Sequence, residues 1–455
     1  MSRKRKNKTS TEPIRPVINA RAAGVDIGAR EIYAAVSPEL DATKPVRCFN
    51  TFTDELKALV EWFQTHGITT VAMEATSVYW IPLAGLLEEA GIEVCLVNPR
   101  HVKNVPGRKT DVQDCQWLQY LHSVGLMRAA FRPPAQVRAI RSLWRHRDGL
   151  VRQSAWRVQH MHKALDQMNI QIHHVITDIT GKSGTAIVEA LLAGERDPAI
   201  LAALGDKRLK ASATTLRAAL VGDCRPEHMF CLRQALEGHR FALQQIAAVD
   251  AELETLHQAL EKSEAPARET PAQNAKPRTR CGCPVGYDAS KLLREHLGVD
   301  LTSIPAINVN TAQTLYAELG RDLSAFKSGK HFASWMGLNP NNKITGGKIL
   351  SAHTKPCGNR VAKALRMAAQ GLHHANNEMG EYYRRMKAKL GGAAGLVAVA
   401  HKLARIIYAM IRTRQAYDST LLRREEGRRK ERMLAQLKRR AKIMGFELTA
   451  IQQPA

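Results

Sequence analysis

Four carboxylates near the start of the chain have the residue type and the placement of a metal-binding set. Asp26 lies in a short strand pattern with a glycine on each side, and Glu74 ends a β-branched, apolar run typical of a buried strand. Asp111 and Asp114 are spaced i and i+3, so they share one face of the helix predicted to follow Thr110. Mg²⁺ and Mn²⁺ select carboxylate oxygens, and two such ions stabilise the attacking and leaving oxygens of a phosphoryl transfer. The four acids therefore predict metal-dependent phosphodiester chemistry.

Asp111 and Asp114 also have a purely structural explanation. Acids in a first helical turn interact favourably with the helix dipole, and this needs no metal. Asp26 and Glu74 are harder to explain in that way, because strands disfavour Asp and unpaired acids are rarely buried. The metal interpretation depends most on these two acids at predicted strand ends.

The elements that position these acids alternate between strand and helix patterns, which is typical of an α/β domain. Two long amphipathic helices are predicted next, over about residues 136–170 and 231–262. They either form an antiparallel coiled coil that is a dimer surface, or pack on each other within one chain. The predicted divisions are a flexible basic tail at 1–20, the domain with the acids at 21–133, a helical region with an insertion at 134–263, a linker at 264–287, a C-terminal domain at 288–418, and a basic helical tail at 419–455.

The charge balance favours nucleic acid as a partner. The formal net charge of +25 over 455 residues attracts phosphates of any sequence. For each basic run the alternative is an ordinary solvated helix face. Basic residues gather in the two tails, in the loop with Arg100, Lys103, Arg108 and Lys109, and in the first long helix at Arg138, Arg141, Arg145, Arg147, Arg152 and Arg157.

The expected compartment is the cytoplasm, without a membrane. The chain contains no apolar stretch of membrane-spanning length, and its basic, polar start does not resemble a signal peptide. The eight cysteines are scattered, so free thiols are expected. Cys281 and Cys283 form a close pair, but no second pair at zinc-finger spacing accompanies them, and no structural zinc is expected.

Several motifs, in their order and spacing, resemble the DEDD-type transposases of bacterial insertion sequences, which are relatives of the Piv invertases. The resemblance covers most of the chain. The motifs in its first part are Gly24–Gly28, Met73–Thr76, Val97–Pro99 and Lys109–Asp114, and those in its last part are Ser303–Ile307, Phe332–Pro340, Gly346–Lys348, Gly358–Arg360 and Ala364–Ala369.

This resemblance implies an α/β RNase H-like domain similar to the RuvC resolvase, an α-helical coiled-coil linker, and a mostly α-helical C-terminal domain with a catalytic serine. It implies that Asp26, Glu74, Asp111 and Asp114 bind Mg²⁺ or Mn²⁺. It also implies a recombinase that exchanges strands of double-stranded donor and target DNA, guided by a structured non-coding RNA. Because the acids and the serine lie in different domains, the resemblance implies a homodimer that pairs into a tetramer.

The serine is where the chain departs from the family. The family's nucleophile usually follows a Gly-Leu-Xaa-Pro motif after a short polar spacer and precedes glycine, and that position holds Thr345. Threonine is a competent but more hindered nucleophile. Ser351 lies just beyond and is the second candidate, and a third possibility is that strand exchange is impaired. Thr345 is favoured because it stands beside a glycine pair that lets a phosphate approach the backbone.

Other residues of the C-terminal domain are assigned to nucleic acid. Lys348 and Lys355 are expected to neutralise charge on the phosphate, and Arg360 to bind the backbone. The domain opens with a segment similar to a helix-hairpin-helix, in which Ala306 and Asn308 replace the usual glycines.

Two other functions are compatible with the same residues. A hydrolytic nuclease or Holliday-junction resolvase would use metal-activated water, and its cutting would survive loss of both hydroxyls. A non-catalytic nucleic-acid-binding protein would bind tightly and show no metal-dependent cleavage.

Overall fold

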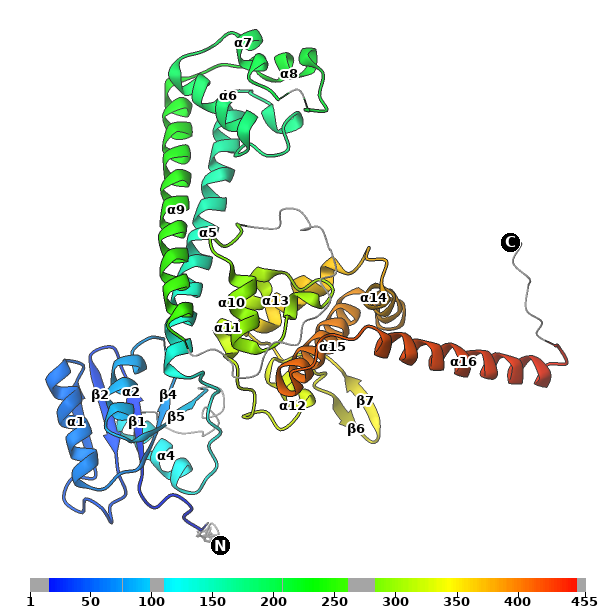
Figure 1. Cartoon of the computed structure of the whole chain (residues 1–455). Helices are drawn as coiled ribbons and strands as arrows, with labels where there is room; N and C mark the ends of the chain where they lie inside the picture. Colours follow the sequence, from blue (N-terminus) through cyan, green and yellow to red (C-terminus); the bar gives the residue numbers. More distant parts are fainter. Residues whose placement is uncertain (1–15, 76, 99–109, 207, 261–282, 448–455) are drawn as a thin grey trace, which may run out of the picture. The chain divides into compact units, whose positions relative to one another are not determined.

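The computed structural model describes residues 16–75, 77–98, 110–206, 208–260 and 283–447 (Figure 1). The four loop residues assigned to nucleic acid, most of the predicted linker and the outermost parts of both predicted tails lie outside these residues. The chain divides into two compact units, Met1–Arg132 and Pro133–Ala455.

The first unit is built on a five-stranded mixed sheet in the order β3-β2-β1-β4-β5. The first three strands form an antiparallel meander, and β4 and β5 run parallel to β1. This arrangement, with helices on both faces, is consistent with the expected RNase H-like fold. The strands are β1 Ala22–Ile27, β2 Glu31–Ala35, β3 Val46–Asn50, β4 Thr70–Glu74 and β5 Glu93–Val97.

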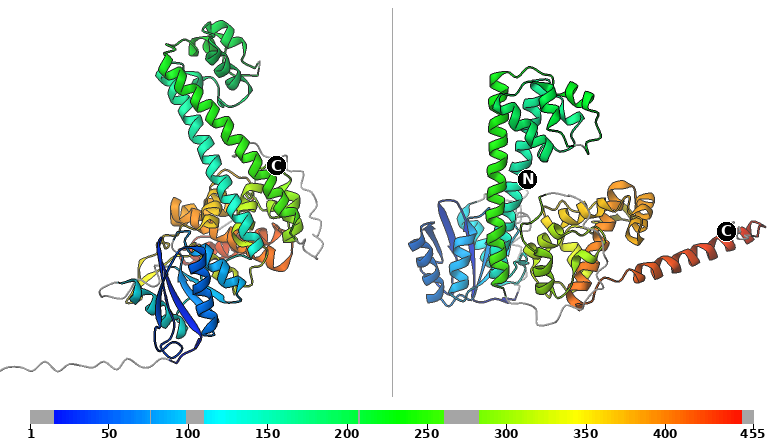
Figure 2. Two further views of the ribbon diagram at one scale, coloured as in Figure 1. Left: turned by 90° about the vertical axis from the view of Figure 1, so that its left-hand side faces the viewer. Right: turned by 45° about the horizontal axis from the view of Figure 1, so that its top comes forward.

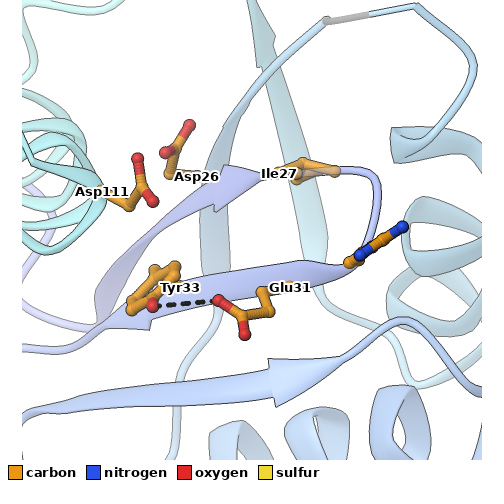
Figure 3. Close-up of a pocket in the computed structure, with 7 residues that line it drawn as sticks. Asp26, Ile27, Glu31, Tyr33 and Asp111 are labelled. Atoms are coloured by element: carbon orange, nitrogen blue, oxygen red, sulfur yellow. Dashed lines mark hydrogen bonds between the residues drawn. The ribbon is translucent and has the colours of Figure 1, made fainter.

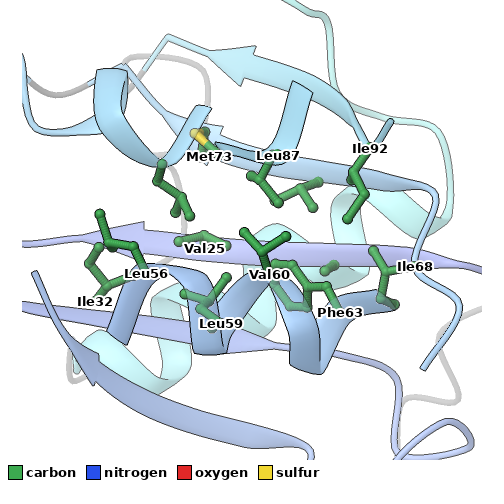
Figure 4. Close-up of a cluster of buried hydrophobic side chains, with 14 of the residues drawn as sticks. Val25, Ile32, Leu56, Leu59, Val60, Phe63, Ile68, Met73, Leu87 and Ile92 are labelled. Carbon is green, nitrogen blue, oxygen red and sulfur yellow. The ribbon is translucent and has the colours of Figure 1, made fainter. Parts of the chain in front are cut away.

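Alternating side chains of the sheet build a core on each face. Val25 and Met73 pack with Leu59, Phe63 and Leu87, which come from α1 (Thr53–Thr65) and α2 (Trp80–Glu89) (Figure 4). On the opposite face a smaller cluster places Leu118 of α4 (Asp111–Ser123) against Ala72, Cys95 and Val97. The central strands are therefore apolar on both faces, which is why their sequences read as nearly continuous apolar runs.

The second unit contains a long antiparallel helical hairpin. The helix predicted over 136–170 is α5, Ala135–Gln167, and the one predicted over 231–262 is α9, Pro226–Gln258. The two lie side by side along their length in all three views (Figures 1 and 2). The two helices therefore pack on each other within one chain, which was one of the two arrangements predicted from the sequence. Pairing of this hairpin with a second copy stays a prediction.

A small helical subdomain closes the far end of the hairpin. Its apolar core joins Met161 and Leu165 of α5 to Leu232 and Leu236 of α9. The insertion between the long helices therefore folds onto them instead of forming a separate linker. Its elements are the short 3-10 helix Ile172–His174 and the helices α6 Lys182–Ala193, α7 Pro198–Ala203 and α8 Ala213–Ala219.

Arginines of α5 make buried ion pairs, one with α9 inside the hairpin and others with α11 (Val309–Leu319). Arg147 is only 3% exposed and makes two hydrogen bonds to the Asp250 carboxylate, at 2.5 and 3.0 Å. Arg141 and Arg145 both pair with the buried Glu318, at 2.9 and 2.8 Å. The expectation of a basic nucleic-acid surface along this helix is wrong for Arg147, which serves an internal ion pair.

Asp250→Ala is expected to lower the free energy of unfolding by about 3–5 kcal/mol, because it leaves the buried Arg147 charge without its carboxylate. Urea unfolding followed by circular dichroism measures this change. Arg152→Ala is the control, since Arg152 is 61% exposed and its pair with Asp148 is worth at most about 1 kcal/mol. Equal unfolding midpoints for the two variants would contradict the structural role of Asp250.

The C-terminal part of this unit is mostly helical, as expected, with one two-stranded sheet. Of the described helices, α15 (Gly392–Thr413) is long and apolar enough to cross a membrane, but its buried residues recur every three or four positions and it packs on α12, α13 and α14. We therefore interpret α15 as a core helix. The other elements are α10 Ala289–Leu297, the short 3-10 helix Leu301–Ser303, α11 Val309–Leu319, α12 Gly329–Trp335, β6 Lys343–Thr345, β7 Lys348–Ser351, α13 Arg360–Gly371, α14 Glu378–Leu390 and α16 Thr420–Ile443.

The segment similar to a helix-hairpin-helix keeps glycine-like backbone at Ala306, one of its two replaced positions. Ala306 has a φ of 73°, in the left-handed region that disfavours a side chain. Asn308 caps α11 by accepting a hydrogen bond from the Thr311 backbone N–H at 2.8 Å. The turn is therefore retained, at a cost in backbone strain.

Candidate active site

Asp26 and Asp111 face one cavity in the first unit (Figure 3). Asp26 stands near the end of β1 and is half-buried, whereas Asp111 is the first residue of α4 and is exposed. The cavity has a volume of about 410 Å³. Its lining residues are Asp26, Ile27, Gly28, Arg30, Glu31, Tyr33 and Asp111.

Gly24 determines how closely α4 approaches β1. A Cβ atom at Gly24 would lie 2.2 Å from the Gln119 backbone nitrogen and 2.4 Å from the Cys115 carbonyl oxygen. The helix backbone therefore rests directly on the strand at this position, which a side chain would prevent. Asp26 follows Gly24 by two residues in β1, and Asp111 precedes Cys115 by one turn in α4. The close packing at Gly24 is what brings these two carboxylates to one place.

Glu74 lies on the strand next to Asp26. Val25 of β1 pairs with Met73 of β4, so Asp26 and Glu74 are the next residues along two adjacent parallel strands. Side chains in register on neighbouring strands point to the same face. Because Val25 and Met73 point into the core under α1 and α2, the two acids point to the face that α4 covers.

Asp114 is half-buried and lies one helical turn after Asp111. Thr110 caps this helix by accepting a hydrogen bond from the Gln113 backbone N–H at 3.3 Å, as the sequence predicts. The next residue, Cys115, is buried, and burial followed by the nearby Asp26 charge raises the pKa of its thiol to about 12. Cys115 is therefore a neutral packing residue near these acids.

The acids at the cavity are suited to bind a hard divalent cation with two carboxylates, those of Asp26 and Asp111. Within the described residues, no group of three or more His, Cys, Asp or Glu side chains lies close enough to hold one ion. Mg²⁺ keeps several waters and is commonly bound by one or two carboxylates together with substrate phosphates. Asp26 and Asp111 supply such a pair at the cavity. We therefore expect the bound DNA to complete the ligand set.

Gly24→Val is expected to lower DNA cleavage at least about a hundredfold, because the added side chain drives α4 and its acids off β1 and a displacement of about 1 Å has that effect. Cleavage of a labelled duplex measures it. Gly85→Ala in α2 is the control, since no atom lies within 4 Å of the added Cβ and alanine favours a helix. Full activity in Gly24→Val would contradict this role of the strand–helix contact.

Glu31 and Tyr33 line the cavity although sequence reasoning did not assign them. Tyr33 pairs with Asp26 across β1 and β2, and its hydroxyl donates to Glu31 Oε2 at 3.1 Å. Hydrogen bonds to Cys48 and then Glu31 raise the pKa of Tyr33 to about 12, so the phenol is neutral at ordinary pH. The alternating pattern of β2 was the available signal, because it places both side chains on one face.

Thr345 and Ser351 lie on the same exposed β-hairpin of the second unit. Thr345 ends β6 and pairs with Lys348, the first residue of β7. Gly346 and Gly347 form the two-residue turn between them, with φ of 54° and 75°. Such a turn requires left-handed backbone at both positions, so the glycine pair has a structural function in the hairpin. The fully exposed strand pattern of β6 makes the Thr345 hydroxyl accessible.

The two hydroxyls differ in their surroundings. Ser351 is half-buried and its hydroxyl accepts a long hydrogen bond, 3.4 Å, from the His353 backbone N–H. Thr345 stands opposite Lys348, whose ammonium is positioned on the same hairpin. These surroundings favour Thr345 as the residue that meets a phosphate.

The other cations assigned to nucleic acid have different positions. Lys355 is exposed and follows the hairpin. Arg360 begins α13 and donates to Asp148 Oδ2 at 2.8 Å, so it is engaged in an ion pair with α5. A phosphate would have to compete with Asp148 for Arg360. The described contacts thus support Lys348 and Lys355 more than Arg360.

Comparison with known proteins gives two family matches. A model for DEDD transposases of the IS110 type, described as "Transposase", matches residues 23–170. A second model, described as "Transposase IS116/IS110/IS902 family", matches residues 300–384. The first match includes all four acids, and the second includes Thr345 and Ser351.

A curated relative is similar to part of the chain. It is the 43.6 kDa protein of insertion element IS110 from Streptomyces coelicolor, which is 32% identical over 133 residues. The match covers 29% of this chain and 33% of the relative, so the chain aligns with about one third of the relative's length.

Proposed function

Since the chain belongs to the DEDD-type insertion-sequence transposases, we propose that it cuts and rejoins double-stranded DNA through a covalent protein–DNA intermediate. The observation that supports this most is the convergence of Asp26 and Asp111 on one cavity. A hydrolytic nuclease also fits that cavity. The exposed hydroxyl of Thr345, beside Lys348, favours strand exchange over hydrolysis.

In this proposal Asp26 and Asp111 would hold the metal at the cavity. Glu74 and Asp114, the other two family acids, would join them only when metal and DNA are bound. When bound, Mg²⁺ would neutralise phosphate charge and stabilise the leaving oxygen. The face of β1 and β4 under α4 carries Asp26 and Glu74, and Asp26 lines the cavity together with Asp111. Glu31 holds the Tyr33 phenol through its hydrogen bond and thereby shapes the opposite wall.

The proposed chemical step uses the Thr345 hydroxyl. Its oxygen attacks phosphorus, a new O–P bond forms, and the bond to the departing nucleotide oxygen breaks, while the hydroxyl proton leaves to solvent. The departing oxygen carries away the electron pair of the broken bond. The phosphodiester is conserved in the protein–DNA link, so attack by another strand end releases Thr345 and completes the exchange without an external energy source. Lys348 and Lys355 lower the charge on the phosphate.

The proposed assembly is a homodimer that pairs into a tetramer on donor and target DNA. A structured non-coding RNA is the proposed guide, and the bacterial cytoplasm, at the nucleoid, is the proposed compartment. The net charge of +25 supports a protein that holds a duplex together with a folded RNA.

The test is a search for a denaturation-resistant adduct. The protein is incubated with Mg²⁺, labelled DNA that carries a candidate insertion junction, and RNA transcribed from the flanking sequence. A protein–DNA adduct that depends on Mg²⁺ and RNA supports the proposal. Free cut ends without an adduct would indicate the hydrolytic nuclease, and binding without cleavage would indicate the non-catalytic alternative.

A further inference from the structure

The last described helix, α16, lies outside both family matches and has no role in the mechanism above. We propose that α16 is a duplex-DNA-binding helix that contacts phosphates on either side of a major groove. This inference rests on the proposed function only in that DNA is the substrate, and it requires neither the metal nor Thr345.

The first turn of α16 is held to the body of the unit, and the side chains of its second half are exposed. Arg423 forms an ion pair with Glu378 of α14. Asp418 accepts a hydrogen bond from the Thr420 backbone N–H at 2.8 Å. From Glu431 to Arg440 every side chain is exposed. The helix is thus anchored at one end and presents its second half to solvent (Figure 1).

Basic residues occur around the whole of this helix, and five of them line up on one face. Arg428, Arg432 and Arg439 are spaced i, i+4 and i+11, so they form one stripe along the axis. Arg424 and Lys442 extend the stripe at its two ends. All five side chains are exposed. From residue 432 to residue 446 the sequence contains no acid, so no neighbour on the helix neutralises this half.

The dimensions of α16 match B-form DNA. Its 24 residues span roughly 36 Å at a rise of about 1.5 Å per residue, close to one helical turn of DNA. The major groove of B-form DNA is about 12 Å wide and admits an α-helix. The major groove of duplex RNA is deep and narrow, and side chains do not read it. An isolated basic helix therefore favours DNA.

A short apolar stripe also runs along α16, but it is too short to favour a second copy of the chain as the partner. Met433, Leu437 and Met444 are 52%, 45% and 72% exposed and lie on one stripe. This stripe covers fewer than two heptads, whereas a coiled coil is indicated by at least about three. The basic side chains along the full helix are therefore stronger evidence for DNA than the apolar stripe is for a second copy of the chain.

The experiment measures how the affinity of the full chain for duplex DNA of arbitrary sequence depends on salt, without metal. The test variant is Arg428→Gln, Arg432→Gln and Arg439→Gln together. The matched control is Lys182→Gln, Lys210→Gln and Arg217→Gln, which removes the same charge from exposed positions of the helical subdomain. The slope of log affinity against log salt is expected to fall by about 3 in the test variant, because each phosphate contact contributes about 0.9, and to stay unchanged in the control.

Three results would overturn the proposal. Equal slope changes in both variants would mean that only bulk charge matters. A loss confined to duplex RNA would assign α16 to RNA, and a changed oligomeric state with unchanged DNA binding would assign it to a second copy.

A further variant, Ala435→Pro, keeps every charge and breaks the helix. It is expected to weaken DNA binding several-fold. Unchanged binding would contradict the proposal that the helical form of α16 positions its basic side chains on DNA. Because this binding is measured without metal and without cleavage, a failure of the recombinase proposal is distinguishable from a failure of this one.

Discussion

Asp26→Asn is expected to lower formation of the protein–DNA adduct by at least about a thousandfold. The amide keeps the size of the side chain but removes the charge that holds the metal beside the cavity. Metal catalysis contributes several kcal/mol to the transition state, and each ~1.4 kcal/mol is a tenfold change in rate. Single-turnover adduct formation at saturating Mg²⁺ measures the effect, and thermal unfolding checks that the variant is folded.

Glu31→Gln is the matched control for Asp26→Asn. Glu31 lines the same cavity and is also an acid, but its carboxylate accepts the hydrogen bond from Tyr33 and is not one of the four family acids. Adduct formation within about threefold of the unmodified protein is expected, because an amide oxygen also accepts that bond. If Glu31→Gln is as inactive as Asp26→Asn, the metal site has been assigned to the wrong acids.

The first unit was largely predictable because its signals are local. Short apolar runs that end in acids predicted the strands, and Thr110 predicted the start of α4. The face to which each acid points follows from strand alternation once the register is known. The register itself, and the contact of α4 with Gly24, depend on residues far apart in sequence. The sequence shows that position 24 is a glycine, but it does not show which helix packs against that glycine.

The second unit shows where residue type alone misleads. Arg147 reads as one more cation of a basic helix, yet Asp250 pairs with it from a position 103 residues away. No local pattern distinguishes a buried arginine from an exposed one. The hairpin of Thr345 is different, because a Gly-Gly pair between two short strand-like segments is a recognisable two-residue turn. The glycines were interpreted as a phosphate contact, and their structural function in the turn was missed.

The nucleophile is the other assignment with a large expected effect. Thr345→Ala is expected to abolish the adduct, with a loss of at least about a thousandfold, because no other group replaces a missing nucleophile. Thr345→Ser is expected to retain or increase the rate, since serine offers the same hydroxyl with less hindrance. The assay is single-turnover adduct formation, with DNA binding measured in parallel to show that only chemistry is lost.

Ser351→Ala is the comparison that makes this assignment decisive. Both residues lie on the hairpin of β6 and β7, so a general disturbance of the hairpin would affect both variants. Ser351 is half-buried and its hydroxyl accepts a long hydrogen bond, so its removal is expected to change adduct formation less than about threefold. An adduct lost in Ser351→Ala and kept in Thr345→Ala would reverse the assignment. Cutting that survives the loss of both hydroxyls would show that water is the nucleophile, because the acids of the first unit would then act without a covalent partner.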